Sequence, residues 1–193
     1  KQGGEGKGGS LTISASSATP VEWTLAPSKS HMIRWLLLSA QGNKPVTLKF
    51  SGSPGEDVIS MVRCLRQLNV EIEIDEGEWI VNGVGPEGFR RPISILHCGN
   101  SATTLRLLTI AAARLDCPVM LDGDRTLRKR HSETLLHILE YLGAEVSHGT
   151  GLEALPYLVH GPLKPGEVTI DVKRSSQPLS ALLLSMPALD GPI

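Results

Sequence analysis

Hydrophobic and polar positions follow two periods along this chain, one typical of helices and one typical of half-buried strands. Five segments have the helical period: 30–40, 58–68, 101–114, 132–142 and 176–186. The first is almost wholly apolar, which predicts a buried helix, and the third and fifth resemble it. Asp57 directly precedes the second segment and is its expected N-cap.

Short alternating segments predict the strands between these helices. They are residues 11–15, 47–50, 70–74, 78–81, 119–121, 145–147, 157–159 and 168–172. The third and fourth are separated by Asp75-Glu76-Gly77, which predicts a hairpin. In order, the elements give the unit strand, helix, strand, helix, strand, strand.

The unit is repeated within the chain. Residues 65–72 resemble 139–146, which lie 74 positions later, and Trp79–Gly83 resembles Tyr157–Gly161, 78 positions later. Self-similarity at a near-constant interval is a signal of fold. We expect the most apolar helices of the units to pack together inside, with the sheets outside. The third copy breaks off at Ile193.

The repeat also predicts how the chain is divided. Residues 1–10 are rich in glycine and predict a flexible tail or an added remnant, and residues 11–23 a lead-in strand or hinge. Residues 24–193 are expected to form one α/β (α+β) domain. Its repeats are expected over about 24–84, 92–162 and 167–193, the last incomplete.

Each apolar helix follows a polar junction of the same kind. The junctions are residues 24–30, 95–101 and 170–177. Helix starts rich in Ser, Asn and Lys offer unpaired N–H groups and positive charge, which together favour anions. Three of them in one fold predict a site for a multiply charged small molecule.

Composition narrows the classes of partner. The chain has 193 residues and a formal net charge of −1, which disfavours broad electrostatic binding to nucleic acid or a membrane surface. No apolar run approaches the length of a membrane span. Three cysteines without a C-x-x-C pair indicate reduced thiols and a cytoplasmic protein. The six histidines lack metal-ligand spacing, so no metal or other cofactor is expected.

Arg34 is the most informative single residue, because it interrupts a helix expected to be buried. It lies one turn after Ser30, and Arg106 repeats the arrangement after Ser101. Both arginines have a structural alternative, a buried ion pair. Lys29 and Ser30 could form an ordinary helix start.

Two other polar segments also have plain structural alternatives. The basic residues from Arg125 to Lys129 could form a solvated face. Ser175, Ser176 and Gln177 could simply cap a helix.

Four segments together resemble motifs of the 3-phosphoshikimate 1-carboxyvinyltransferase family, the EPSP synthases. They are Pro27-Ser-Lys-Ser-His-Met-Ile-Arg34, Gly99-Asn-Ser-Ala-Thr-Thr-Leu-Arg106, Leu127-Arg-Lys-Arg-His131 and Ser175-Ser-Gln-Pro178. They occur in the family's order, and the match as a whole covers roughly residues 11–193. The resemblance implies half of an inside-out α/β barrel enzyme, made of two domains with three βαβαββ repeats each.

The resemblance also implies the reaction and the roles of residues. The enolpyruvyl group of phosphoenolpyruvate would be transferred to the 5-hydroxyl of shikimate 3-phosphate, releasing phosphate. Lys29 would touch both substrates, and Arg130 would bind phosphoenolpyruvate near the Asn100–Ala102 turn. The residues implied for shikimate 3-phosphate are Ser30, Arg34, Ser175, Ser176 and Gln177, the last lying between the substrates. The groups for proton transfer would come largely from a second domain, in the same chain or as a separate fragment, so this chain alone is expected to be inactive or weakly active.

Some positions depart from the family's motifs. Pro27 and Ala102 stand where glycine is usual, and Leu107, His131 and Pro178 also differ from common choices. The methyl group of Ala102 is expected to crowd inhibitors larger than phosphoenolpyruvate, such as glyphosate. Two alternatives stay open: a relative of UDP-N-acetylglucosamine enolpyruvyl transferase, disfavoured by Ser30 where that family has Asn, and a non-catalytic anion-binding module.

Overall fold

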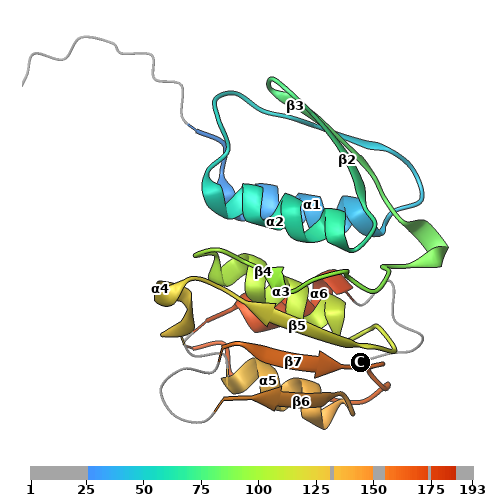
Figure 1. The fold of residues 1–193 in the computed structure, drawn as a ribbon, viewed down its shortest axis with the longest axis vertical. Coiled ribbons are helices and arrows are strands. Elements are labelled where there is room, and N and C mark those ends of the chain that lie inside the picture. Colours follow the sequence, from blue (N-terminus) through green and yellow to red (C-terminus); the bar gives the residue numbers. More distant parts are fainter. Residues whose placement is uncertain (1–25, 131–132, 150–154, 174, 186–193) are drawn as a thin grey trace, which may run out of the picture.

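A computed structural model describes residues 26–130, 133–149, 155–173 and 175–185, which form two similar units and one further helix (Figure 1). The first unit contains α1 (Lys29–Gln41), β1 (Val46–Lys49), α2 (Glu56–Gln67), β2 (Glu71–Asp75) and β3 (Glu78–Asn82), and a 3₁₀ turn, η1 (Gly85–Glu87), follows it. The second contains β4 (Leu96–His97), α3 (Ala102–Ala112), β5 (Pro118–Asp122), α4 (Arg125–Arg128), α5 (Glu133–Tyr141), β6 (Glu145–His148) and β7 (Tyr157–His160). The last described element is α6 (Gln177–Ser185).

The two sheets have the same strand order, which supports the repeat expected from the sequence. The first sheet is β1-β3-β2, and the second is β4-β5-β7-β6, so β5-β7-β6 repeats the first order. In the first sheet β3 lies between β1 and β2, and in the second β7 lies between β5 and β6; each pairs antiparallel with both neighbours. The predicted hairpin is confirmed, with Asp75 paired to Glu78. β4 pairs in parallel with β5, unlike the antiparallel pairs of the other described strands.

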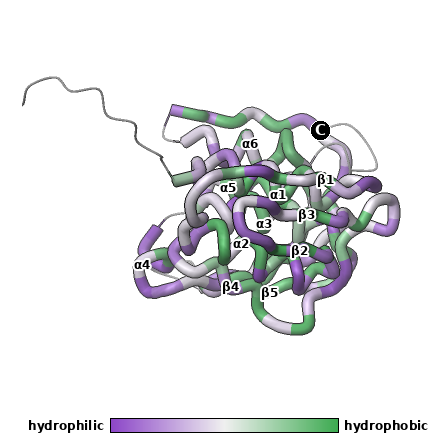
Figure 2. The backbone as a smooth tube through the Cα atoms, turned by 90° about the horizontal axis from the view of Figure 1, so that it is seen from above, coloured by the Kyte–Doolittle hydropathy of each residue, from purple (hydrophilic) through white to green (hydrophobic). Residues whose placement is uncertain are grey.

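The apolar helices pack together, as the hydrophobic pattern predicts. In Figure 1, α1 and α2 lie beneath the first sheet, and α3 and α6 lie below this pair, level with β4 and β5 of the second sheet. Ile33, Leu36 and Leu37 of α1 and Leu107 and Leu108 of α3 are fully buried. The tube view shows these hydrophobic stretches running through the middle of the molecule (Figure 2). The inside-out arrangement therefore holds in the part of the chain that the structure describes.

Two glycines at equivalent places in the repeat hold each sheet against a helix end. Gly83 follows β3 and lies against the end of α1, where a Cβ would come within 2.9 Å of the Gly42 nitrogen and closer to the Gly42 oxygen. Gly161 follows β7 and lies against the end of α3, where a Cβ would come within 2.7 Å of the Ala113 carbonyl carbon. Only a residue without a side chain fits such an approach.

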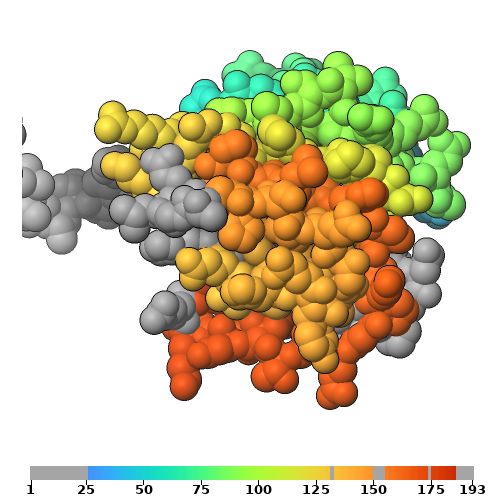
Figure 3. Space-filling view, turned by 60° about the horizontal axis from the view of Figure 1, so that its bottom comes forward, coloured from blue at the N-terminus to red at the C-terminus, as the bar shows by residue number. Residues whose placement is uncertain are grey.

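Three details differ from the sequence expectations. Residues 168–172 form no strand, although a strand was expected there; the segment is partly exposed and lies on the surface in dark orange in Figure 3. The N-cap of α2 is Gly55, not Asp57, which sits in the first turn. In α1, Trp35 is 56% exposed and Leu38 36%, so one side of this helix is not buried.

Some expectations fall outside the described residues. The predicted strand at 11–15 and the tail before it lie there, so the proposed division of the chain stays a prediction. Across the described ranges, no helix is long and apolar enough to cross a membrane.

Candidate functional site

A cavity of about 770 Å³ lies where the first turns of α1, α3 and α6 meet. Lys29 and Ser30 come from α1, Ala102, Thr103 and Arg106 from α3, and Gln177 and Pro178 from α6. Arg130 follows α4, and Glu133, Thr134 and Leu135 open α5. Asp57 of α2 and Ser175 complete the described lining. The junctions that the sequence singled out therefore converge on one cavity.

A second hollow, of about 550 Å³, lies between α1 and β1. Its described lining is mainly apolar, with Met32, Trp35 and Leu48 among its members, and includes none of the predicted site residues. We therefore assign the chemistry to the polar cavity.

The start of α1 presents donors to the cavity. Ser28 is at the N-cap position, but its side chain makes no capping hydrogen bond. The first N–H groups of this helix thus have no side-chain cap, and the helix dipole adds partial positive charge there. Lys29 follows, and its ammonium group lies 2.9 Å from a carboxylate oxygen of Asp57. An anionic ligand would have to compete with Asp57 for this charge.

Arg34 supports Ser30 one turn further along α1. Its guanidinium donates to the Ser30 hydroxyl at 2.6 Å and to the Ser30 carbonyl at 2.9 Å. It also contacts the Ser180 hydroxyl of α6 at 3.5 Å. The predicted pairing of Arg34 with Ser30 on one helix face is confirmed. Arg34 itself is half-buried behind the cavity wall rather than among the residues that line it.

The start of α3 is joined to α6 by side-chain hydrogen bonds. Arg106 donates to the Gln177 amide oxygen, and the Gln177 amide nitrogen donates to Thr103 at 3.2 Å. The buried Ser101 hydroxyl caps α3 by accepting from the Thr104 N–H and donating to the Thr104 hydroxyl. Ser101 is therefore occupied by its own helix, whereas Thr103 and Arg106 face the cavity.

Arg106 lies in an environment that is unfavourable to its charge. Burial lowers the pKa of the Arg106 guanidinium from its ordinary value, and the positive charge of Arg130 lowers this pKa further, although Tyr157 acts in the opposite direction. Two cations held close together in a partly buried cavity gain from an anion between them.

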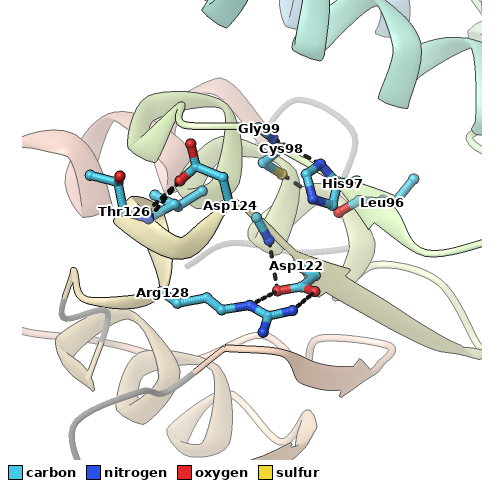
Figure 4. A network of polar contacts seen from close by, with 10 residues as sticks. Leu96, His97, Cys98, Gly99, Asp122, Asp124, Thr126 and Arg128 are labelled. Carbon is cyan, nitrogen blue, oxygen red and sulfur yellow. Dashed lines mark hydrogen bonds and ion pairs between the residues drawn. The ribbon is translucent and has the colours of Figure 1, made fainter.

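The turn before Arg130 is fixed by a network of polar contacts (Figure 4). Asp122 ends β5, and both of its oxygens accept from the Arg128 guanidinium, Oδ1 at 3.0 Å from Nε. Asp124 caps α4 by accepting from the N–H groups of Thr126 and Leu127. The sequence alternative that Arg128 belongs to a solvated face is thus wrong, since its charge folds back onto Asp122.

The structure brings together most, but not all, of the predicted site residues. Those that line the cavity are Lys29, Ser30, Ala102, Arg130, Ser175 and Gln177. Asn100 is exposed on the turn before α3, and Ser176 is exposed before α6; neither is among the lining residues. The basic motif's His131 lies outside the described residues.

The sequence did not identify every residue of the cavity. Thr103, Asp57 and Glu133 line it but were not predicted. Arg106 was noted as the repeat of Arg34, and this signal alone could have placed it at the site. In the described ranges, no cluster of three or more His, Cys, Asp or Glu side chains could hold a metal ion. The cavity's chemistry is therefore that of N–H groups, hydroxyls and three cations, Lys29, Arg106 and Arg130, beside two carboxylates.

Comparison with known proteins agrees with this geometry. The sequence pattern of the EPSP synthase (3-phosphoshikimate 1-carboxyvinyltransferase) family matches residues 15–193. A 3-phosphoshikimate 1-carboxyvinyltransferase of Synechococcus sp. (strain WH7803) is 43% identical over 168 residues, covering 85% of this chain and 38% of that protein. The enzyme of the same name from Methanothermobacter thermautotrophicus is 33% identical over 184 residues, covering 94% of this chain and 42% of that protein. The chain thus spans about two fifths of the length of these relatives.

Solved structures give the same answer for the fold. EPSP synthase from Acinetobacter baumannii superposes with a TM-score of 0.76 at 28% identity, covering 84% of this chain and 37% of that one. The enolpyruvyl transferase NikO from Streptomyces tendae gives a TM-score of 0.58 at 14% identity, covering 86% of this chain and 38% of its own, which supports the fold alone. The expected architecture, the α/β fold of enolpyruvyl transferases, is confirmed, and the chain belongs to the EPSP synthase (3-phosphoshikimate 1-carboxyvinyltransferase) family.

Proposed function

We propose that this chain supplies one side of a site that transfers the enolpyruvyl group of phosphoenolpyruvate to the 5-hydroxyl of shikimate 3-phosphate, with release of phosphate. The observation that carries the proposal is the convergence of three helix starts and three cations on one cavity. Both substrates are anions with phosphate and carboxylate groups, which N–H donors and guanidinium forks bind well. The names of the relatives supply the reaction, and the cavity supplies matching chemistry.

The roles proposed for the residues are those that the resemblance to the family implies, and the cavity is consistent with them. Lys29 lines the cavity and would contact both substrates, after exchanging Asp57 for an anion. Ser30, fixed by Arg34, and Ser175 would hold shikimate 3-phosphate, with Gln177 between the ligands. Arg130, beside Ala102, would bind phosphoenolpyruvate. Asn100 and Ser176 would need a local movement to join them.

The transfer also needs an acid for the vinyl carbon and a base for the attacking hydroxyl. We assign these groups mainly to a second domain, in the same polypeptide or as a separate fragment, and its closure would exclude water. Fixed positive charges on this side would stabilise the phosphate as it leaves. A reaction between two small soluble anions suits a cytoplasmic enzyme.

Calorimetric titration of the chain with shikimate 3-phosphate tests the proposal. Arg34→Ala removes the support of Ser30 and is expected to weaken binding by about tenfold, as loss of a charge-assisted contact commonly does. Arg90→Ala is the matched control, since Arg90 is an exposed arginine that pairs with Glu87 outside the cavity. Equal affinities for wild type and both variants would contradict the proposed role.

A further inference from the structure

The contacts around α4 suggest a role for two residues that do not line the cavity. Asp122 and Arg128 form a two-point ion pair, and Asp122 also accepts from the Gly123 N–H at 2.7 Å. The Asp122 side chain is 10% exposed and that of Arg128 38%. Both oxygens of a nearly buried carboxylate are thus engaged, an arrangement that fixes geometry more than exposed pairs do.

The ion pair between Asp122 and Arg128 links the two ends of a short segment that leads to Arg130. The chain leaves β5 at Asp122, makes one turn of helix and reaches Arg130 eight residues later. The Arg128 N–H donates to the Asp124 carbonyl at 3.0 Å, and the Arg130 N–H donates to the Leu127 carbonyl at 2.9 Å. Backbone hydrogen bonds therefore link Arg128 and Arg130 to residues earlier in the turn.

The turn is also held against the neighbouring junction. The Asp124 N–H donates to the Gly99 carbonyl at 2.8 Å, and the Cys98 N–H donates to the Asp122 carbonyl at 2.8 Å. A Cβ at Gly123 would come within 2.8 Å of the Gly99 oxygen, so the two turns touch. Leu127 is fully buried and anchors the middle of α4. These contacts fix the start and the middle of α4. The direction in which the chain leaves the end of α4 is restrained by the link from Arg128 to Asp122.

We propose that Asp122 and Arg128 are positioning residues that hold Arg130 at the cavity, and so set the affinity for the anion that Arg130 binds. The inference rests on the proposed function, in which this anion is phosphoenolpyruvate. Without the pair, the last turn of α4 can fray, because a helix of four residues has few internal hydrogen bonds to hold it. Arg130 is exposed and has no such carboxylate partner among the ion pairs of the described residues. Its place therefore depends on the backbone that carries it.

The test is the affinity for phosphoenolpyruvate in the presence of saturating shikimate 3-phosphate. Asp122→Asn and Arg128→Gln are each expected to weaken it by about tenfold, since a small misplacement of a binding group is costly. Affinity for shikimate 3-phosphate alone should stay within about twofold, because its proposed contacts lie on α1 and before α6. Asp116→Asn, at the exposed opposite end of β5, is the matched control and should change neither affinity.

Combining Asp122→Asn with Arg130→Ala shows whether Asp122 acts by positioning Arg130 or by stabilising the fold in general. Asp122→Asn should have no further effect on phosphoenolpyruvate affinity when Arg130→Ala is already present, because the residue through which it acts is gone. An Asp122→Asn effect that persists in this background, equal losses for both ligands, or no loss would overturn the inference. Thermal melts accompany each titration, and if Asp122→Asn does not fold, the more exposed Arg128→Gln decides the question.

The same experiment distinguishes failure of the proposed function. If wild type binds neither anion, or if Arg130→Ala leaves phosphoenolpyruvate affinity unchanged, the proposed site fails and the inference fails with it. If Arg130→Ala weakens phosphoenolpyruvate binding while Asp122→Asn and Arg128→Gln do not, the site stands and only the positioning role falls.

Discussion

Adding a single methyl group at Gly161 should destabilise this protein far more than a surface change. The Cβ of Gly161→Ala would lie 2.7 Å from the Ala113 carbonyl carbon, and closer still to its oxygen. Ordinary contacts between carbon atoms lie at about 3.5–4.0 Å, so β7 and the end of α3 must separate by about 1 Å. Both groups are backbone and cannot rotate away.

The separation has a calculable cost. Two hydrogen bonds join these segments, from the Gly161 N–H to the Leu115 carbonyl at 3.1 Å and from the Leu163 N–H to the Ala113 carbonyl at 3.0 Å. Stretching both by about 1 Å removes most of their contribution, about 1–3 kcal/mol together. Overpacking adds about 1–3 kcal/mol. The expected loss is about 4 kcal/mol, which lowers the Tm of a chain of this size by roughly 8 to 16 °C.

Thermal and urea denaturation followed by circular dichroism measure this loss. Gly83→Ala is an internal replicate, since the repeat places Gly83 against the end of α1 in the same way. Gly55→Ala is the control, because nothing lies within 4 Å of its Cβ and its φ of −74° suits alanine; we expect a change within about 1 kcal/mol. Melting of Gly161→Ala within about 2 °C of Gly55→Ala would refute the packing argument.

Four further predictions concern the buried polar groups and the cavity. The Thr109 hydroxyl makes hydrogen bonds with the Tyr157 hydroxyl and the Leu105 carbonyl. Thr109→Val leaves the buried Tyr157 hydroxyl without this partner, and urea denaturation should show a loss of about 1–3 kcal/mol in the free energy of unfolding. Tyr157→Phe removes the hydroxyl itself and should cost less. Burial raises the pKa of the Tyr157 phenol, and the hydrogen bond with Thr109 offsets only part of this rise. Folding therefore favours the protonated phenol, so the stability that this group contributes is complete below the ordinary tyrosine pKa of about 10 and is lost as the pH rises above it. The free energy of unfolding should fall above about pH 10 more steeply in wild type than in Tyr157→Phe. Burial acts to raise the pKa of Asp122, but hydrogen bonds from Arg128 and Gly123 lower it below its ordinary value. The stability that the Asp122 carboxylate contributes is therefore present above about pH 4 and is lost on acidification. The urea midpoint should fall less between about pH 5 and pH 2 in Asp122→Asn than in wild type. Ala102→Gly in an active, full-length form should increase affinity for glyphosate, and inhibition curves unchanged from wild type would count against crowding by that methyl group.

The sequence was most informative where local pattern and repeat agreed. The similarity of Trp79–Gly83 to Tyr157–Gly161 predicted two equivalent strands, and the structure places both in the middle of like-ordered strands. Spacing along a helix was enough to pair Arg34 with Ser30, because residues four apart share a face. The first conclusion needs only a comparison between two copies of the repeat, and the second needs only the spacing of residues along one helix.

It was less informative where the outcome depends on contacts between distant elements. Residues 168–172 alternate as a strand does, but a strand also needs a partner, which the pattern cannot supply. The link between Asp122 and Arg128 depends on the chain turning back on itself after β5, so composition suggested a solvated arginine. Asp57 was assigned to a cap, yet its carboxylate pairs with Lys29 at 2.9 Å because α1 and α2 pack side by side.

The helix α3 connects the cavity with the close backbone contact at Gly161. α3 presents Ala102, Thr103 and Arg106 to the cavity, and its other end meets Gly161 about 16 Å away, the length of 11 helical residues. Sliding this helix along its axis would change how far the arginine projects into the binding space. The absence of a side chain at a distant glycine thus helps to determine the depth of the pocket, and changes there offer a route to altered ligand size without touching any group that meets the ligand.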